Sequence, residues 1–344
     1  MGKLKYAIAR FLYRRKLRQR LKECVSNESK DRILLLNVPS HGNLGDHLIS
    51  VAEKQLVKDI KGYEPLTFTT ADLYYGIDLI ENVINPCDVV LITGGGYLGS
   101  LWPEEEARVL KLVNDLRDNT IVVLPQTVYY DQDNVSRKMM ADAQKTYSRR
   151  NEVFLTVREK RSLDVVNKDL GLPQSQSALL PDMALYLNFS NHDRERDGII
   201  LCIRNDKEKG YKGDLMSVIK ENVDGRNVRY LDTQVNRSVS QSDEDREVRG
   251  LIEQFQSAQL VITDRLHGML YATICGTPVI ALDNYSHKVK NVYECWLKDL
   301  DYVRFVDNVS ELPKSMTELL DNGAGEYNSE RYRGLLQSYL KEKI

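Results

Sequence analysis

The chain has 344 residues, 42% of them hydrophobic and 28% charged, and its formal net charge is −2. This composition is typical of a soluble globular protein, the length allows two domains, and the near-neutral charge argues against a general nucleic-acid binder. The five cysteines are scattered and form no CxxC pair, which indicates reduced thiols in a cytoplasmic protein and not a disulfide framework or a zinc site. No apolar run reaches the length of a membrane span, and the N-terminus lacks the apolar core of a signal peptide.

Residues 1–25 form a basic arm, because every charged residue from Lys3 to Lys22 is a cation. A helix over this arm would carry Leu4, Ile8, Phe11 and Leu12 on one face, although the apolar stripe drifts further along. Basic amphipathic helices are typical of proteins that bind an anionic membrane surface, here the inner face of the plasma membrane. The alternatives are a solvated helix packed on the body of the protein and a disordered arm.

A buried strand is predicted from Asp31 to Val38, and a helix follows it after a loop with two glycines. In this loop Gly45 lets the backbone approach a ligand, and Asn43, Asp46 and His47 supply polar groups. A strand, a glycine turn and a helix make up the ligand-binding corner of open α/β sheets. The alternative is that Asn43 and Asp46 only shape the turn and cap the helix.

A second glycine turn, Gly94 to Gly96, follows the next predicted strand. With Gly99 it formally satisfies the GxGxxG pattern of dinucleotide binding. The match is weak, because the following helix does not open directly on the glycines and no acid closes the next strand. We interpret Gly95 and Gly96 as part of a backbone nest that contacts a sugar or an anionic ligand.

Two further strands end in polar side chains. The strand from Thr120 to Val128 carries Gln126 near its end, and the strand from Glu152 to Val157 is followed directly by Arg158. A cation at the carboxyl end of a parallel strand stands where ligands bind in such sheets. The alternation of strands and helices therefore predicts a doubly wound α/β domain over residues 26–190.

A polar segment from Asn188 to Asp197 is the best candidate for a linker, and a second α/β series begins after it. Its first predicted strand, Gly198 to Ile203, ends in Arg204. We expect a second domain of similar architecture over residues 191–344, which includes the terminal helices, and a cleft between the two domains.

The stretch from Leu260 to Lys288 is the strongest candidate for a site. An apolar strand precedes Thr263 and Asp264, which offer oxygens to cap a helix, and Arg265 and His267 stand on the first turn of that helix. Helix N-termini favour anions, because free backbone N–H groups and the helix dipole point there. The pattern predicts an anionic substrate beside a titratable imidazole; the alternative for the histidine is a satisfied core residue.

Several segments together resemble the polysaccharide pyruvyl transferase family, from about Ile33 to Tyr293. The GNxGD turn and the RLHG block with its GxPVIAL continuation are fairly specific in combination. The segments are NVPSHGNLGDHLI (Asn37 to Ile49), LITGGGYLGS (Leu91 to Ser100), LTVREKRS (Leu155 to Ser162), LPDMAL (Leu180 to Leu185) and ITDRLHGMLYATICGTPVIALDNYSHK (Ile262 to Lys288).

The resemblance implies an α/β fold of two Rossmann-like domains that face each other across a cleft, of glycosyltransferase B type. It implies transfer of a pyruvyl group from phosphoenolpyruvate to two hydroxyls of a sugar, as a cyclic ketal, during biosynthesis of bacterial exopolysaccharide or capsule. The RLH motif places the donor-binding arginine at Arg265 and the catalytic histidine at His267. Arg204 matches less closely as a second donor-binding arginine, and Gly268 and Lys288 of the same block are assigned to the donor.

The resemblance assigns the first domain to the acceptor. The expected acceptor is a galactose in an oligosaccharide linked to polyprenyl pyrophosphate at the cytoplasmic leaflet. The candidate contacts are the polar and glycine positions of the loops and strand ends described above, namely Asn43, Gly45, His47, Gly95, Gly96, Gln126 and Arg158.

The chemistry fits these residues independently. Phosphoenolpyruvate carries a carboxylate and a phosphate, so it requires fixed cations, and arginine suits both groups. Protonating its methylene carbon creates a cationic centre that a sugar hydroxyl attacks, and a histidine is the natural acid near neutral pH. Asp46 or Asp264 is the expected base. Neither a metal nor a cofactor is expected, since the histidines are dispersed.

Two other interpretations stay open. A nucleotide-sugar glycosyltransferase would use the same fold, but Asp283 is the only acid near the position where a carboxylate would clamp the ribose. A membrane-associated scaffold of a glycan assembly complex would keep the fold without activity, although the intact His267, Arg265 and Asp46 argue against this.

Overall fold

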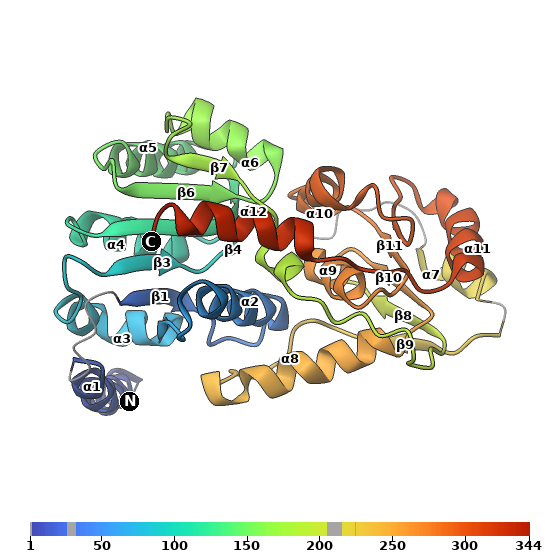
Figure 1. The fold of residues 1–344 in the computed structure, drawn as a ribbon, viewed down its shortest axis with the longest axis horizontal. Helices are drawn as coiled ribbons and strands as arrows, with labels where there is room; N and C mark the ends of the chain where they lie inside the picture. The colour runs from blue at the N-terminus through green and yellow to red at the C-terminus, as the bar shows by residue number, and fades with distance from the viewer. Residues whose placement is uncertain (1, 26–31, 205–214, 224) are drawn as a thin grey trace.

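Runs of buried aliphatic residues form two parallel β-sheets in the computed structural model, which describes residues 2–25, 32–204, 215–223 and 225–344. The first strand shows the pattern, because all of its residues are buried, as expected for a strand covered by helices on both faces. Each sheet with its helices makes an α/β domain, and the two domains lie beside each other along the long axis of the molecule (Figure 1).

The first sheet, as far as the chain is described, has seven parallel strands in the order β2-β1-β3-β5-β6-β7, with β4 paired to β5. Its strands are β1 (Ile33–Val38), β2 (Leu66–Thr69), β3 (Val89–Ile92), β4 (Gly95–Gly99), β5 (Thr120–Tyr129), β6 (Val153–Val157) and β7 (Ser177–Leu179). The helices here are α1 (Gly2–Val25), α2 (Leu44–Lys61), α3 (Thr70–Glu81), α4 (Pro103–Asp115), α5 (Asn134–Tyr147) and α6 (Lys160–Asp164), with a π-turn at Val165–Asp169 and a 3₁₀ turn at Met183–Tyr186.

The second sheet has five parallel strands among the described residues, in the order β12-β11-β10-β8-β9. They are β8 (Ile199–Cys202), β9 (Val228–Tyr230), β10 (Leu260–Thr263), β11 (Val279–Ala281) and β12 (Val303–Phe305). The helices are α7 (Leu215–Glu221), α8 (Gln241–Gln256), α9 (Leu266–Ile274), α10 (Lys288–Val292), α11 (Leu312–Asn322) and α12 (Glu330–Lys341), with a π-turn at Tyr293–Leu297 and a 3₁₀ turn at Val309–Glu311.

Both sheets are wound in the same way. In each domain the first strand lies between the second and the third main strand, so that the winding reverses between β1 and β3 and again between β8 and β10. Ligands of doubly wound sheets bind outside the carboxyl ends of the strands at this reversal. The prediction of two Rossmann-like domains is therefore confirmed, and the loops after these four strands are the expected site.

The apolar core is continuous between the domains. One cluster covers a face of each sheet and joins α2, α8, α9 and α12. A second cluster fills the other face of the first sheet with α3, α4 and α5, and a third fills the other face of the second sheet with α7 and α11. Alternate residues of β1 serve both sides, because Leu35 enters the shared cluster and Leu34 and Leu36 enter the second.

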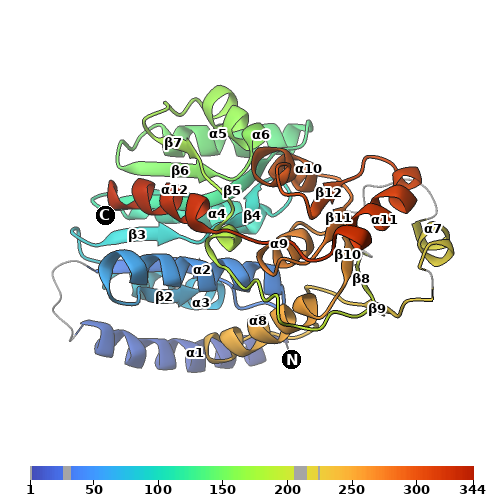
Figure 2. The same ribbon diagram turned by 45° about the vertical axis from the view of Figure 1, so that its right-hand side comes forward.

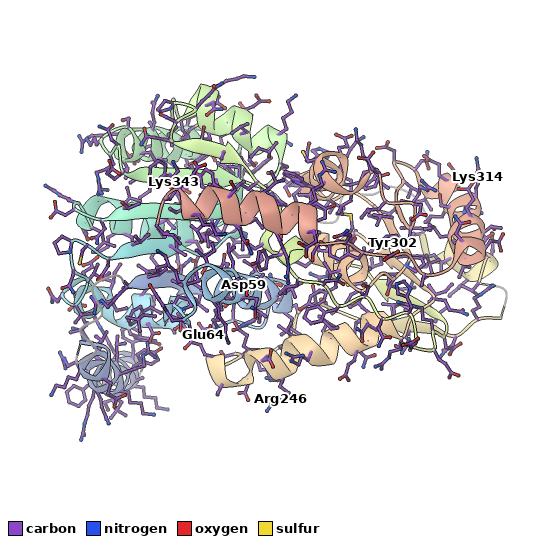
Figure 3. All side chains as sticks on the ribbon, in the orientation of Figure 1. Asp59, Glu64, Arg246, Tyr302, Lys314 and Lys343 are labelled. Atoms are coloured by element: carbon purple, nitrogen blue, oxygen red, sulfur yellow. The ribbon has the colours of Figure 1, made fainter. Side chains whose placement is uncertain are left out.

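The last helix, α12, packs on the first domain although it closes the chain (Figure 1). Leu336 and Leu340 join the core that includes α2, and the ammonium of Lys343 lies 4.3 Å from the ring centroid of Phe154 in β6. Figure 3 shows Lys343 on this side of the molecule. The sequence analysis grouped the terminal helices with the second domain, whereas the last of them, α12, packs on the first. The boundary at residue 190 stays a prediction.

The basic N-terminal arm is a helix, α1, that packs along α3 on the outer side of the first domain (Figure 2). Leu17 and Leu21 are buried in the cluster that contains α3, and Arg14 forms a bidentate pair with Asp78, with both distances at 2.7 Å. The interpretation as a helix packed on the body is thus confirmed; the side chain of Leu4 lies outside the described part. Within the described ranges, no helix combines the length and the apolar character that crossing a bilayer requires.

The second glycine turn is less open than the sequence suggested. Gly95 belongs to β4, a short strand that pairs with β5. The prediction of an open backbone nest at Gly95 is therefore wrong. Pro125 lies inside β5, and the register with β6 shifts between Val123 and Gln126, which accommodates the missing N–H.

Candidate active site

A cavity of about 530 Å³ opens where the carboxyl ends of the two sheets face each other. Its walls come from the loops after β1 and β3 in the first domain and after β8 and β10 in the second, which are the two reversals of winding. Cavities of roughly 300–1,000 Å³ at such positions are typical ligand sites. The cavity therefore occupies the interdomain cleft that the sequence predicted.

Four cations and an imidazole converge on this cavity from separate segments of the chain. Arg158 follows β6, Arg204 follows β8, Arg265 and His267 follow β10, and Lys288 begins α10. Such a concentration of fixed positive charge suits a ligand with more than one negative group. The predicted site residues that line the cavity are Asn43, Asp46, Gly96, Arg158, Arg204, Arg265, His267 and Lys288.

Arg265 is held in place by the end of β10. It is the N-cap residue of α9, and its backbone N–H donates to Oγ1 of Thr263 at 3.0 Å. Thr263 thus holds the backbone of Arg265 and does not cap the helix, contrary to the prediction, because no side chain of the described residues caps α9. Its Nη2 donates to Oδ2 of Asp232 at 2.9 Å, whereas its buried Nε has no hydrogen-bond partner. Asp232 is exposed, so the pair lies at the rim of the cavity, and the guanidinium keeps a donor for a ligand.

His267 stands in the first turn of α9 and is 9% exposed. Its Nε2 has no hydrogen-bond partner and lies 3.9 Å from Oδ2 of Asp182. Burial lowers the pKa of the imidazole below its usual 6.5, and the carboxylates of Asp182 and Asp46 offset part of this effect. His267 is therefore not a satisfied core histidine, and a bound anion would favour its protonated form, as proton transfer near neutral pH requires.

Gly45, at the start of α2, packs directly against the imidazole of His267 from the other domain. A Cβ atom on Gly45 would lie 2.1 Å from Nδ1 of His267. We expected Gly45 to contact the acceptor, but it does not line the cavity. Its role is to let the first domain pack against the ring of His267, because any side chain would displace that ring.

Arg158 and Asp182 form a buried pair beneath the histidine. Arg158 is 1% exposed; its Nη1 donates to Oδ2 of Asp182 at 2.6 Å, and its Nε donates to Oγ1 of Thr127 at 2.9 Å. Asp182 also accepts from the N–H of Ala184 at 2.9 Å. Sequence reasoning missed Asp182 as a site residue, although it belongs to the LPDMAL segment directly after β7, where a strand end was a usable signal.

Asp46 is both a turn residue and a site residue. Its Oδ2 accepts from Nδ2 of Asn43 at 2.8 Å, and Oδ1 of Asn43 caps α2 by accepting from the N–H of Gly45 at 3.1 Å. The side chain of Asp46 is partly exposed and lines the cavity. Asp46 thus remains the candidate base, and the capping that the sequence offered as an alternative is carried out by Asn43.

Asp264 and Gly268 do not line the cavity, contrary to expectation. Asp264 is buried, its Oδ1 accepts from the N–H of Arg204 at 2.8 Å, and burial raises its pKa to about 6. A Cβ atom on Gly268 would lie 2.3 Å from Oγ1 of Thr263. We therefore correct both assignments: Asp264 holds the loop that carries Arg204, and Gly268 lets α9 pack closely on β10.

His47, Gly95 and Gln126, which the sequence assigned to the acceptor, also lie outside the cavity. His47 is fully buried; its Nδ1 lies 2.8 Å from Oε1 of Glu244 in α8, and its Nε2 lies 2.8 Å from the carbonyl oxygen of His41. Gln126 is buried and donates to the carbonyl of Thr93 at 2.8 Å. The side chains of His47 and Gln126 have polar atoms occupied within the protein, and Gly95 belongs to β4, so we assign all three to the structure and not to the acceptor.

The fold is that of an α/β protein of glycosyltransferase B type, with cations gathered in its interdomain cleft. The sequence profile of the polysaccharide pyruvyl transferase family matches residues 43–287, a range that contains the glycine turns, Arg158, Asp182 and the RLHG block. The chain belongs to the polysaccharide pyruvyl transferase family.

Individual relatives extend this similarity over most of the chain. It is 31% identical to General stress protein 30 of Bacillus subtilis, over 85% of this chain and 86% of the relative. It is 27% identical to pyruvyl transferase 1 of Schizosaccharomyces pombe, over 86% of this chain and 77% of the relative. Among solved structures, an uncharacterised protein of Klebsiella pneumoniae shares the fold with a TM-score of 0.56 at 17% identity, over 86% of this chain and 98% of that one.

Proposed function

We propose that the protein transfers the pyruvyl group of phosphoenolpyruvate to two hydroxyls of a sugar, as a cyclic ketal, during the synthesis of a bacterial surface polysaccharide. The observation that carries the proposal is the convergence of Arg158, Arg204, Arg265 and Lys288 around the buried His267. Membership of a family named for pyruvyl transfer to polysaccharide supports a glycan acceptor. A galactose in a lipid-linked oligosaccharide is the acceptor we propose.

The cations divide the two anionic groups of the donor between them. Arginine binds carboxylate and phosphate with paired donors, whereas lysine acts as a point charge. The unpaired Nε of Arg265 and the position of Arg158 in the floor of the cavity fit these roles. No cofactor takes part in this scheme, because phosphoenolpyruvate supplies both the transferred group and the leaving phosphate.

The reaction needs an acid and a base on opposite sides of the donor. His267 gives a proton to the methylene carbon, and a first sugar hydroxyl attacks the adjacent carbon while Asp46 takes the hydroxyl proton. The bond from this carbon to the phosphate oxygen then breaks, phosphate leaves, and a second hydroxyl closes the ketal. One of the two hydroxyl protons returns to His267 and the other leaves with the phosphate, so that the enzyme is regenerated.

The direct test is phosphate release from phosphoenolpyruvate in the presence of a lipid-linked galactoside, with mass spectrometry of the acceptor. We expect phosphate release that depends on the acceptor, and an acceptor that gains one pyruvic acid less one water. Turnover with a UDP-sugar and not with phosphoenolpyruvate would establish the glycosyltransferase interpretation instead. The absence of turnover with either donor would favour the scaffold.

We also propose that α1 holds the protein on an anionic membrane, at the inner face of the plasma membrane. The helix binds the protein through one side, which carries Leu17 and Leu21. Ile8, Phe11 and Leu12 lie on the opposite side by helical spacing and are each at least half exposed. The cations beside this apolar face, namely Lys5, Lys16 and Arg18, are exposed as well, and so is Arg15, which lies within the face by helical spacing. An outward apolar face with a basic border suits an anionic lipid surface.

Sedimentation with vesicles tests this part of the proposal. The wild type should sediment with vesicles that contain phosphatidylglycerol and not with pure phosphatidylcholine, and a Phe11→Glu/Leu12→Glu variant should stay in solution. Val135→Glu is the matched control, because Val135 is an equally exposed apolar residue on α5. Unchanged sedimentation of the double variant would show that α1 has another role.

A further inference from the structure

The two domains give the cavity walls of different chemistry. The second domain supplies Arg204, Arg265, His267 and Lys288. The first domain supplies Asp46 and Arg158 and, separately, a wall of uncharged and aromatic groups with one carboxylate, which comes from the end of β1, the start of α3, β4 and the start of α4. This wall, called the Trp102 wall below, is formed by Asn37, Thr70, Tyr97, Trp102 and Glu105. A three-carbon donor occupies only part of a cavity of about 530 Å³, so space remains beside the cations.

The Trp102 wall contains a built polar network. Nδ2 of Asn37 donates to Oε2 of Glu105 at 3.2 Å, and Nη1 of Arg108 donates to Oδ1 of Asn37 at 3.2 Å and to Oε2 of Glu105 at 2.5 Å. Asn37 adopts a left-handed backbone conformation, with φ of 66°, at the end of β1. Residues in this backbone conformation persist where the surrounding contacts stabilise them, and they are frequent at functional sites. Here the strain places the amide of Asn37 at the cavity and fixes the carboxylate of Glu105.

The same wall is unsuited to a second anion. The first turn of α4 carries Glu104, Glu105 and Glu106, which already compensate the positive end of the helix dipole. Glu106 is buried and accepts from the N–H of Gly99 at 2.7 Å. The ligand of this wall is therefore neutral and rich in hydroxyl groups that can donate to a carboxylate.

Trp102 provides a flat apolar surface beside this network. It lines the cavity and is 47% exposed, so part of its indole ring is accessible to a ligand there. A pyranose ring has one apolar face of C–H groups and a rim of hydroxyls, so it matches an indole next to Glu105 and Asn37. We propose that the Trp102 wall is the acceptor subsite, where a neutral hexopyranose stacks on Trp102 and donates hydroxyl protons to Glu105.

This inference adds to the proposed function and rests on it for the reaction, but sugar binding itself can be tested without turnover. Saturation-transfer NMR with the methyl glycosides of galactose, glucose and mannose reports binding directly. Intrinsic fluorescence gives a second readout, since the chain has only two tryptophans and Trp296 is partly buried, with its Nε1 donating to the carbonyl of Arg158 at 2.8 Å. We expect at least one glycoside to bind and to alter the emission of Trp102.

Substitutions then locate the site. Trp102→Ala should weaken glycoside binding at least tenfold, Trp102→Phe less, and Glu105→Gln by an intermediate amount, while thermal stabilisation by phosphoenolpyruvate stays at the wild-type level. Tyr230→Ala is the matched control, because Tyr230 is an exposed aromatic residue on β9 that does not line the cavity. Unchanged binding in Trp102→Ala, or no binding of any of the three glycosides to the wild type, overturns the proposal.

Two combinations separate the acceptor subsite from the proposed reaction. Glycoside binding that depends on Trp102, without any effect of phosphoenolpyruvate, would leave the subsite standing and defeat the donor assignment. Turnover of phosphoenolpyruvate with an acceptor KM that Trp102→Ala does not change would leave the reaction standing and defeat the subsite.

Discussion

Two buried histidines, one in each domain, stand in the first turn of a helix and have opposite surroundings. His47 lies in α2, which follows β1, and His267 lies in α9, which follows β10; both strands border a reversal of winding. Both ring nitrogens of His47 face acceptors in the protein, an arrangement that the protonated ring satisfies fully. Nε2 of His267 has no partner and the ring lines the cavity.

The difference shows which buried histidine serves the structure and which one is available for a reaction. His47 joins α2 to α8 through Glu244, which also accepts a hydrogen bond from Lys54, so the buried carboxylate of Glu244 is satisfied across the interdomain contact. His267 keeps a buried nitrogen without a partner, which costs free energy in the absence of ligand. A satisfied buried group stabilises the domain arrangement, whereas an unsatisfied one at a cavity is available for a substrate.

The largest expected effect is on activity at His267. His267→Gln should lower kcat of pyruvyl transfer by about 10²–10⁴-fold, because it removes the general acid. The midpoint of chemical unfolding should change little, since no hydrogen bond of Nε2 is lost. Loss of folding in this variant would support the core-histidine interpretation, and wild-type turnover would remove His267 from the mechanism.

The next largest effect is expected at Gly45, which stands two residues before His47 in the chain and packs against the ring of His267. Gly45→Ala places a methyl group 2.1 Å from Nδ1 of His267, and a displacement of about 1 Å in a catalytic group costs about 10²-fold in rate. We expect this loss in kcat with a folded protein, measured beside circular dichroism. Gly250→Ala is the control, because a Cβ atom on Gly250 meets nothing within 4 Å. Normal activity of Gly45→Ala would show that the ring can move without consequence.

Replacing His47 should affect stability more than chemistry. His47→Ala removes one partner of a buried, charged contact, so the free energy of unfolding should fall by about 2 kcal/mol. Phosphoenolpyruvate should still stabilise the folded variant, because His47 does not line the cavity. A double-mutant cycle with Glu244→Ala measures the coupling, and a coupling near zero would contradict the interdomain role.

The smallest expected effect on the rate is a shift in pH dependence at Asp182, although loss of its buried pair with Arg158 should also destabilise the fold. An acid must be protonated to act, so kcat/KM should fall as pH rises through the lowered pKa of His267, below 6.5 in the free enzyme. Asp182→Asn removes a carboxylate that raises this pKa, so the fall should move to lower pH. Glu64→Gln, on the surface shown in Figure 3, should leave the profile unchanged. A shift to higher pH would contradict the role of Asp182.

Much of the fold was predictable because it follows from local patterns. Continuous apolar runs such as Leu34 to Leu36 predict strands covered on both faces, and polar residues directly after them predict the edge where ligands bind. The position of α12 was not predictable, because an amphipathic helix carries no information about which sheet its apolar face will cover.

The candidate site was predictable in part and for a similar reason. Arg158, Arg204, Arg265 and His267 were found because each lies at, or within four residues of, the carboxyl end of a strand. His47 was assigned wrongly, because a histidine in a glycine-bearing loop looks the same in sequence whether its nitrogens point to a ligand or to Glu244.

The sequence by itself determined the alternation of strands and helices, the family, and a cluster of cations at the ends of strands, because these depend on residue type and spacing. Only the tertiary structure decided which groups meet. It brought Asp182 to His267 and set Trp102 opposite the cations, because these contacts join segments far apart in the chain and depend on how the two sheets face each other. The same packing gave both ring nitrogens of His47 partners and left the buried Nε2 of His267 without one beside the cavity.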